Sequence, residues 1–349
     1  MLNKMRKKRA MAIETAGAGE LALLEQLRRR VPRFGSAGVR LGIGDDCALL
    51  RLPPDEELAL TTDLSIAGRH FRLDWHPPES VGHRTLARGL SDLAAMGARP
   101  VAAFLSLGLP GELTRPQRRL PSWMDRFLDG FLVLAAANRT PLAGGDLAES
   151  PFVVADIVLA GAVPRGKALL RSGARPGNLL YVTGSLGGAA AGLEGLGKLA
   201  GTAKTPSALA AVLKKDKALF GEHLYPHPRL IQGIELRRLG LATAALDLSD
   251  GLSTDLAHLC RESGVAAELD VSQLPVHPAA AIAQALHGGE DYELLFSAPA
   301  TARLPRSIAG VPVTRIGRII PRRSGRRTIT LITPGGRVPL LPQGWEHFS

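Results

Sequence analysis

Short acidic clusters, each flanked by glycine or serine, limit how this chain can fold more than any other feature of its sequence. Carboxylates that gather repel one another and raise one another's pKa unless cations neutralise them. Clusters of this kind are therefore difficult to explain without a cation that neutralises them. The six clusters are residues 42–46, 61–63, 91–92, 144–146, 247–251 and 288–293.

The composition of these clusters predicts magnesium chemistry. A single Asp-Gly pair is usually only a turn, but turns alone do not explain six clusters in a chain of net charge +11. The donors are hard oxygen atoms without Cys or His at metal-ligand spacing, which favours magnesium over zinc or copper. Glycine beside the carboxylates lets backbone N–H groups approach phosphate oxygens. We therefore expect magnesium to serve a phosphate-bearing substrate.

The familiar phosphate-binding motifs are absent from the sequence. Residues 192–198, GLEGLGK, have P-loop spacing, but Leu199 replaces the Ser or Thr that would hold magnesium. The segment also follows a helix-like stretch of Ala and Leu instead of opening a helix after a strand, so we expect a helix end and a loop there. Residues 184–188, GSLGG, lack Rossmann spacing.

Length and composition predict a globular protein of two domains. The 349 residues are about twice a typical domain of roughly 150. No apolar run reaches the roughly 18 residues that span a bilayer, and the basic start lacks a signal-peptide core, so we expect a cytoplasmic protein. Cys47 and Cys260 lie far apart without CxxC spacing, which gives no reason to expect a disulfide framework or a thiolate metal site.

The order of expected elements favours an α/β fold of the α+β type. Helical periodicity marks residues 20–30, 78–97, 121–138 and 252–263, and extended segments lie near 57–62, 101–109, 152–163, 178–183, 241–246, 266–271 and 292–297. The regular rhythm of a doubly wound sheet is missing. The pattern of the sequence changes after Val163, and we interpret the residues that follow as a connector between two domains. We expect a basic tail at 1–15, an N-terminal domain at 16–163 and a C-terminal domain at 164–349.

Positive charge concentrates at the two ends of the chain. Five of the first nine residues are Lys or Arg, and from Leu294 to Trp345 there are nine Arg and no acidic residue. Such a stretch is compatible with a nucleic-acid-binding face. However, three Trp and three Tyr supply few stacking groups, and no recognition motif accompanies the arginines. We therefore favour a solvated basic surface.

Taken together and in order, the motifs resemble one family. GIGDDCALL, TTD followed by AGRHF, LSDLAAMGA, GGD, DLSDGLSTDL and GGEDYEL are similar to those of thiamine-monophosphate kinase, and the resemblance runs from about residue 27 to 348. It includes the connector RGKALLRSGARPGN and the terminal GWEHF. It implies the two-domain fold of aminoimidazole ribonucleotide synthetase, with mixed sheets and flanking helices, a homodimer, and ATP bound without a Walker loop. The N-terminal domain would bind ATP and magnesium and dimerise, and the C-terminal domain would complete the substrate site.

The resemblance also implies roles for individual residues. The metal ligands would be Asp46, Thr61, Thr62 (through its backbone), Asp63, Asp92, Asp146, Asp247 and Asp250. Asp63, Asp92 and Asp250 would be catalytic. Gly145, Asp146, Arg171 and Ser249 would contact ATP, while His70, Glu290 and Trp345 would hold thiamine monophosphate. Local departures from the family pattern are Leu147 after GGD, Gly89 before LSD and Ser65 after TTD.

The implied reaction is direct in-line transfer of the γ-phosphoryl group of ATP to the phosphate of thiamine monophosphate, assisted by several magnesium ions. It yields thiamine diphosphate and ADP, as the last step of thiamine diphosphate biosynthesis. The acceptor phosphate has a second pKa of about 6, so it is mostly deprotonated at neutral pH and needs no general base. The main obstacle is repulsion between two polyanions, which magnesium would screen.

Blander interpretations apply to several of these residues. His70 could equally be a half-buried structural histidine, and Trp345 a residue of the hydrophobic core. Arg171 could equally be a solvated arginine in a loop. Asp255 fits a carboxylate in the first turn of a helix. Asp291 and Glu293 are either structural or support Glu290.

Alternative functions within the same superfamily fit less well. A selenophosphate synthetase-like protein needs a reactive Cys that residues 1–40 lack, and a hydrogenase-maturation relative should end in a modifiable Cys where this chain reads HFS. The motifs GGEDYEL and DLSDGLSTDL argue against an aminoimidazole ribonucleotide synthetase.

Overall fold

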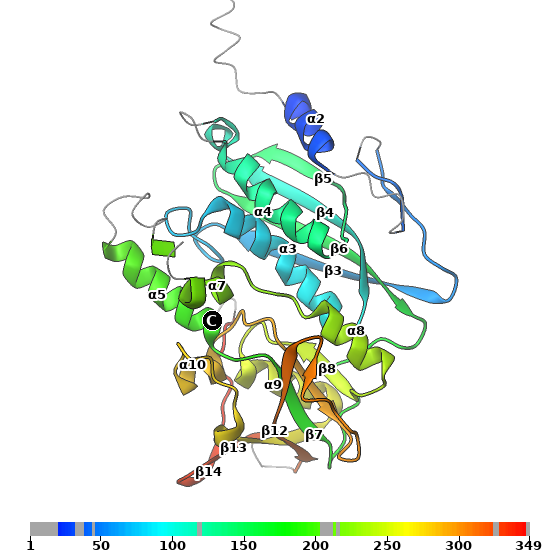
Figure 1. Cartoon of the computed structure of the whole chain (residues 1–349), viewed down its shortest axis with the longest axis vertical. Helices are drawn as coiled ribbons and strands as arrows, with labels where there is room; N and C mark the ends of the chain where they lie inside the picture. The colour runs from blue at the N-terminus through cyan, green and yellow to red at the C-terminus, as the bar shows by residue number, and fades with distance from the viewer. Residues whose placement is uncertain are drawn as a thin grey trace, which may run out of the picture. The chain divides into compact units, whose positions relative to one another are not determined.

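The computed structural model describes residues 20–31, 38–43, 46–116, 121–202, 212–213, 217–323 and 328–346. The expected tail at 1–15, and Gly44 and Asp45 of the first acidic cluster, lie outside these residues. The chain divides into two compact units (Figure 1). Unit 1 comprises Met1–Arg51, Thr62–Leu86 and Val101–Leu159, and unit 2 comprises Leu52–Thr61, Ala87–Pro100 and Ala160–Ser349. The expected division of roles at residue 163/164 stays a prediction.

The first half of the chain builds a four-stranded sheet with helices. Its elements are α2 (Glu20–Arg30), β1 (Val39–Leu41), β2 (Leu49–Leu50), β3 (Glu56–Ile66), α3 (Pro78–Ala95), β4 (Arg99–Leu109), the 3-10 helix η1 (Gly111–Thr114), α4 (Trp123–Ala137), β5 (Leu142–Glu149) and β6 (Val154–Pro164). The strands β1 and β2 form an antiparallel pair. The sheet has the order β3-β6-β4-β5, and β4 runs parallel to β5.

Close backbone packing fixes the helices of this half. A Cβ atom on Gly82 of α3 would lie 1.9 Å from the Phe127 carbonyl oxygen of α4, and one on Gly130 would lie 1.8 Å from the Glu79 oxygen. Glycine at both positions therefore lets the two helices touch. α4 begins after Ser122, whose hydroxyl accepts the Asp125 N–H.

The second half builds a larger mixed sheet around its own hydrophobic core. The strands have the order β14-β13-β9-β12-β7-β10-β8, with β11 paired to β12. β13 runs parallel to β9, whereas β7 and β8 each pair antiparallel with β10. The elements are β7 (Leu179–Thr183), α5 (Gly188–Thr202), α7 (Lys217–Leu224), α8 (Leu230–Arg238), β8 (Ala244–Asp247), α9 (Leu252–Ser263), β9 (Val265–Asp270), η2 (Val271–Gln273), α10 (Ile282–His287), β10 (Leu294–Ala298), β11 (Ser307–Ile308), β12 (Val311–Pro321), β13 (Ile329–Thr333) and β14 (Gly336–Pro339).

Mixed sheets with flanking helices confirm the expected α/β fold of the α+β type, and the expected helices and strands appear within a few residues of their predicted ends. One local expectation was wrong: residues 192–198 lie inside α5 rather than at a helix end and a loop. The error arose because glycine inside a helix looks like a helix boundary in the sequence. Among the described helices, none has the length and apolar character needed to cross a membrane.

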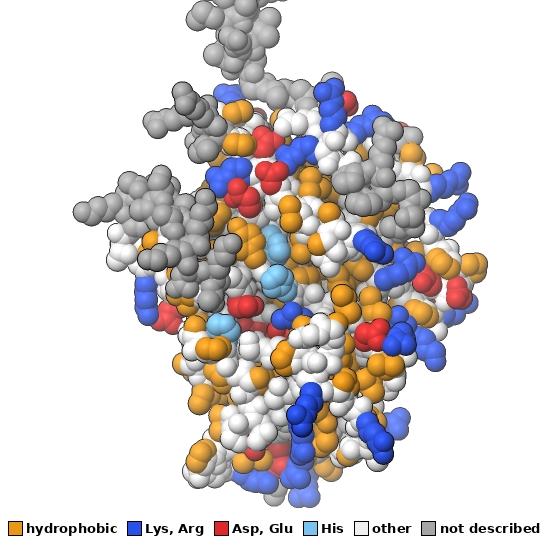
Figure 2. Space-filling model, in the orientation of Figure 1, with side chains coloured by type: hydrophobic (Ala, Val, Ile, Leu, Met, Phe, Trp, Pro, Cys, Tyr) orange, Lys and Arg blue, Asp and Glu red, His pale blue; other side chains and the backbone are white. Residues whose placement is uncertain are grey.

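Part of the arginine-rich C-terminal region serves the fold itself. Arg318 of β12 and Arg337 of β14 both pair with the buried carboxylate of Glu268 in β9, at N–O distances of 2.6 and 2.5 Å. On the face drawn in Figure 2, Lys and Arg side chains are scattered among polar and apolar ones instead of forming one stripe. Arg318 and Arg337 therefore have a structural role, and a solvated basic surface stays the prediction for the other arginines of this region.

Candidate active site

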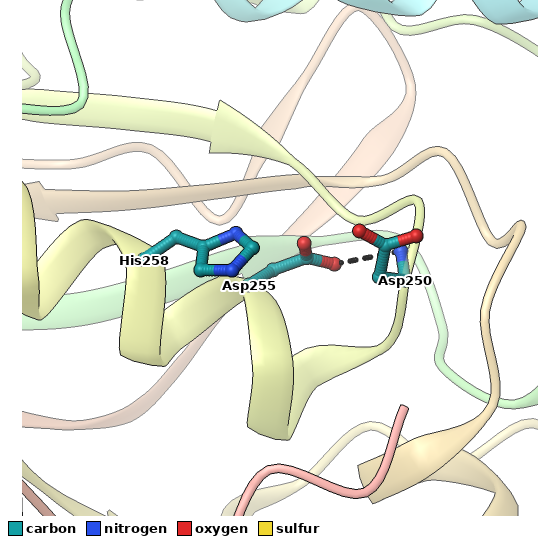
Figure 3. A group of neighbouring side chains, drawn as sticks. All are labelled: Asp250, Asp255 and His258. Carbon is teal, nitrogen blue, oxygen red and sulfur yellow. Dashed lines mark hydrogen bonds between the residues drawn. The ribbon is translucent and has the colours of Figure 1, made fainter. Parts of the chain in front are cut away.

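The loop between β8 and α9 brings carboxylates together at the start of a helix. Asp247 ends β8 and is buried, and Asp255 lies buried in the first turn of α9. One carboxylate oxygen of Asp255 accepts the backbone N–H groups of Asp250 and Gly251, both at 3.0 Å, and Figure 3 shows the bond to Asp250. Gly251 has φ +108°, and a Cβ there would lie 2.7 Å from the His287 oxygen. The sequence DLSDG therefore folds back onto the helix that follows it.

Negative charge accumulates in this loop. Burial raises the pKa of Asp255 to about 8, with further contributions from the charges of Asp247 and Asp250. One ligand atom each from Asp250, Asp255 and His258 lies within 4.8 Å of the others (Figure 3). Burial, with the charges of Arg261 and Arg171, lowers the pKa of His258, so its imidazole is neutral at pH 7. A divalent cation beside these groups would relieve the repulsion that raises the pKa of Asp255.

The pKa of Asp255 leads to a test by pH-dependent unfolding. Between about pH 4 and pH 8 the folded protein holds a proton on Asp255 that the unfolded chain has lost, so the free energy of unfolding falls as pH rises through this window. Asp255→Asn keeps an oxygen for the two backbone N–H groups but cannot ionise. In EDTA we expect the variant to lose about 1–3 kcal/mol less stability than the wild type between pH 5 and pH 8.5. Urea unfolding measures this, and parallel stability curves would contradict the assignment.

Residues of α3 and β3 form hydrogen bonds next to this loop and add a further, partly buried carboxylate, that of Asp92. The Thr61 hydroxyl of β3 donates a short hydrogen bond to Asp92, and the buried Ser91 hydroxyl donates to Asp247 at 2.6 Å. Burial raises the pKa of Asp92, while the Thr61 hydroxyl and the charges of Arg171 and Arg88 act in the opposite direction. Four of the eight predicted metal ligands therefore lie on segments of unit 2 that are joined by hydrogen bonds. These are Thr61, Asp92, Asp247 and Asp250.

Backbone hydrogen bonds hold the loop of residues 288–293 against the loop of residues 247–251. The Glu290 N–H donates to the Ser249 oxygen at 2.8 Å, and the Tyr292 N–H donates to the Leu248 oxygen at 2.9 Å. Glu290 and Tyr292 have φ of +67° and +50°. A non-glycine residue adopts this left-handed conformation at a cost of about 1 kcal/mol or more, and it persists where the surroundings impose it. Glu290 is thus fixed beside Ser249.

The C-terminal segment completes this arrangement. The Trp345 N–H donates to the backbone carbonyl oxygen of Asp250 at 3.0 Å. A Cβ on Gly344 would lie 1.9 Å from the same carbonyl oxygen. The Trp345 residue is 49% exposed, so the interpretation as a core residue was wrong. Ser249, Glu290 and Trp345, which are far apart in sequence, therefore meet at one loop.

Asp291 and Glu293 each bind other segments of unit 2, and the alternative that they support Glu290 stays a prediction. Asp291 accepts the N–H groups of Gly187 and Ala189 at 2.6 and 3.2 Å, and burial raises its pKa to about 7. Glu293 accepts the Thr183 hydroxyl at 2.6 Å and the Arg229 Nε–H at 2.7 Å. Sequence reasoning missed Arg229, because its partner lies 64 residues away and no local pattern marks the pair.

The remaining predicted residues lie in unit 1, apart from the exposed Arg171. The Nδ1 atom of His70 accepts the Ile66 N–H at 3.1 Å, so in this arrangement the ring proton lies on Nε2. Gly145 has φ +145°, and a Cβ there would lie 1.8 Å from the Leu105 oxygen, which only glycine tolerates. Asp146 faces outward on β5. The participation of Asp46, Thr62, Asp63 and Asp146 in one metal site stays a prediction.

Known proteins are similar to this chain over most of its length. Residues 44–164 match AIR synthase related protein, N-terminal domain, and residues 175–330 match AIR synthase related protein, C-terminal domain. The chain is 39% identical over 343 residues to thiamine-monophosphate kinase of Escherichia coli K12, covering 95% of this chain and 98% of the relative. The relative from Haemophilus influenzae is 35% identical over 326 residues, covering 89% and 92%.

Solved structures agree with the sequence comparison. Thiamine-monophosphate kinase of Stenotrophomonas maltophilia superposes with a TM-score of 0.75 at 37% identity, covering 90% of this chain and 96% of that one. AaThiL, solved in complex with AMPPCP and TMP, gives a TM-score of 0.68 at 30% identity, covering 95% and 97%. The hydrogenase maturation protein HypE, at 18% identity, shares the fold alone. The chain therefore belongs to the thiamine-monophosphate kinase family.

Proposed function

We propose that this protein transfers the γ-phosphoryl group of ATP to thiamine monophosphate by in-line displacement, in the cytoplasm, as the last step of thiamine diphosphate synthesis. The main support is the loop of residues 247–251, which contacts the segments carrying Asp92, Glu290 and Trp345. A relative of this family was solved with AMPPCP and TMP, which fits a site for both substrates.

The residues present fit several magnesium ions. Carboxylate and hydroxyl oxygens are the donors that magnesium prefers. Burial is the main cause of the raised pKa of Asp255, and the charges of Asp247 and Asp250, which a cation would neutralise, add to it. When bound, magnesium would screen the repulsion between the two phosphate groups and stabilise the transition state. Its ligands would be Asp46, Thr61, Thr62, Asp63, Asp92, Asp146, Asp247 and Asp250.

The other predicted residues bind and orient the two substrates. Gly145, Asp146, Arg171 and Ser249 hold ATP, and the exposed guanidinium of Arg171 adds positive charge near Asp92. His70 and the Glu290 carboxylate contact thiamine monophosphate, and the Trp345 side chain, from a residue that is 49% exposed, stacks on the cationic thiazolium. The acceptor phosphate is already deprotonated at neutral pH, so no side chain has to remove a proton.

A direct assay tests this function. The purified protein is incubated with ATP, magnesium and thiamine monophosphate, and thiamine diphosphate is followed by chromatography. We expect product that disappears when EDTA removes the metal and returns when magnesium is added in excess. ATP binding without product would move the search to other phosphate-bearing acceptors. Loss of both ATP binding and product would exclude the kinase function.

We also propose a homodimer, formed through an exposed face of β3. Side chains alternate along a strand, so Leu58, Leu60 and Leu64 lie on one face, and all three are exposed. Exposed leucines on one face of a strand are typical of an interface. The partner that fits is a second copy of this chain, as the family resemblance implies.

Charge placed on this face should separate the subunits. Leu60, which is 64% exposed, becomes Lys in the test variant, because a buried unpaired ammonium opposes association. We expect wild type at twice the chain mass by light scattering, and Leu60→Lys at the mass of one chain. Val133→Lys on α4 is the matched control, since Val133 is 70% exposed on a different element. A monomeric wild type, or a dimeric Leu60→Lys, would refute this interface.

A further inference from the structure

Two helices behind the Glu290 loop have no part in the proposed function. We propose that His223 of α7 is a positioning residue that orients the Glu290 carboxylate toward thiamine monophosphate, and that Gly192 of α5 makes this possible by letting α7 approach. The inference rests on the proposed function, because the contact between Glu290 and thiamine monophosphate belongs to it.

The contact between His223 and Glu290 is the first support. The His223 side chain is 2% exposed, and its Nδ1 lies 3.6 Å from one carboxylate oxygen of Glu290, whose side chain is 25% exposed. One carboxylate oxygen of Glu290 therefore lies beside a buried imidazole, while the Glu290 side chain as a whole is partly exposed. A buried polar group beside a carboxylate favours the rotamers that keep the two together, because separation would leave the imidazole without this partner.

The backbone around Glu290 is the second support. Its left-handed φ of +67° directs the side chain in a way that an extended residue would not. The hydrogen bonds to Ser249 and Leu248 fix the backbone, but they leave the side-chain torsions open. A contact to the carboxylate favours some of those torsions over others, and His223 supplies such a contact from a buried position.

The packing of α5 against α7 explains how His223 reaches this position. A Cβ on Gly192 would lie 2.8 Å from the Leu219 oxygen and 3.0 Å from the His223 Cβ, so the two helices touch at this glycine (Figure 1). Gly192 thus has a packing role in a segment whose spacing resembles a P-loop. The start of α5 is in turn bound by Asp291, the residue after Glu290. The loop and the two helices therefore hold one another in place.

Substrate-specific kinetics test this role. His223→Leu keeps the volume but removes the ring nitrogens, and we expect the KM for thiamine monophosphate to rise about tenfold with the KM for ATP within about twofold. His223→Asn places an amide nitrogen where Nδ1 stands and should restore most of the affinity. Gly192→Ala pushes α7 outward and should reproduce the His223→Leu effect. Gly201→Ala makes the same change in the same helix, where a Cβ meets open space, and should match wild type.

Binding and stability measurements separate the possible outcomes. Calorimetric titration of His223→Leu with thiamine monophosphate, and separately with AMPPCP, should show weaker binding of thiamine monophosphate and unchanged binding of AMPPCP. Wild-type KM values in His223→Leu would overturn the inference. An equal loss of affinity for both substrates would also overturn it, because it indicates a merely structural role. If His223→Leu does not fold, His223→Asn and Gly192→Ala carry the same comparison. A wild type that neither binds nor phosphorylates thiamine monophosphate would overturn the proposed function itself, and the inference with it.

Discussion

Replacement of Asp250 by asparagine should lower kcat by about a thousandfold or more while the protein stays folded. The substitution removes a full ligand charge from the loop that would hold magnesium, and only one neutral oxygen remains. The fold should tolerate it, because the backbone N–H of Asp250, and not its carboxylate, makes the bond to Asp255. The negative charge of Asp250 also raises the pKa of Asp255, so its removal should not reduce the stability of the metal-free protein.

Steady-state kinetics at saturating ATP and thiamine monophosphate, with magnesium varied over a wide range, measure this effect. Asp63→Asn should behave similarly if Asp63 belongs to the same metal site. Asp129→Asn is the matched control, because it makes the same charge change at an exposed position on α4, where Asp129 pairs with Arg30. Wild-type turnover of Asp250→Asn at saturating magnesium would remove Asp250 from the mechanism.

Loss of the Arg229 side chain should produce the largest change in stability. Glu293 is buried and receives two charged hydrogen bonds from Arg229, at 2.7 Å from Nε and 2.5 Å from Nη2. Arg229→Met keeps much of the aliphatic volume but leaves a buried carboxylate without its cation. We expect the free energy of unfolding to fall by about 3–5 kcal/mol, as for other buried pairs that lose one partner.

The double variant Arg229→Met/Glu293→Gln isolates the cause. The neutral amide that Glu293→Gln introduces can still accept the Thr183 hydroxyl, so the double variant should be more stable than Arg229→Met alone. Urea unfolding of the wild type, both single variants and the double variant completes the cycle. Additive losses would show that the two residues act independently, contrary to their bidentate contact.

Four helices (α2, α3, α4 and α9) and the strands β3, β4 and β6 to β10 were predictable, because their signals are local. The leucine periodicity of residues 252–263 predicts α9 with both ends correct, and residues 20–30 predict α2 equally well. The helices α5, α7, α8 and α10 and the strands β1, β2, β5 and β11 to β14 were not predicted, and in β11 to β14 Arg, Pro and Gly interrupt the apolar residues. Their stability comes from partners distant in the sequence, such as Glu268 for Arg318 and Arg337.

The properties of the candidate site were likewise predictable only in part. The sequence by itself determined which residue types could hold magnesium and phosphate, since six glycine- or serine-flanked acidic clusters are a chemical signature that needs no coordinates. Only the tertiary structure decided that Asp255 is a buried group with a raised pKa, that Arg229 neutralises Glu293, and that His223 stands behind Glu290. The reason is physical. Residue identity fixes the chemistry of a side chain, but burial and the distance to a partner depend on packing between segments that are far apart in the chain.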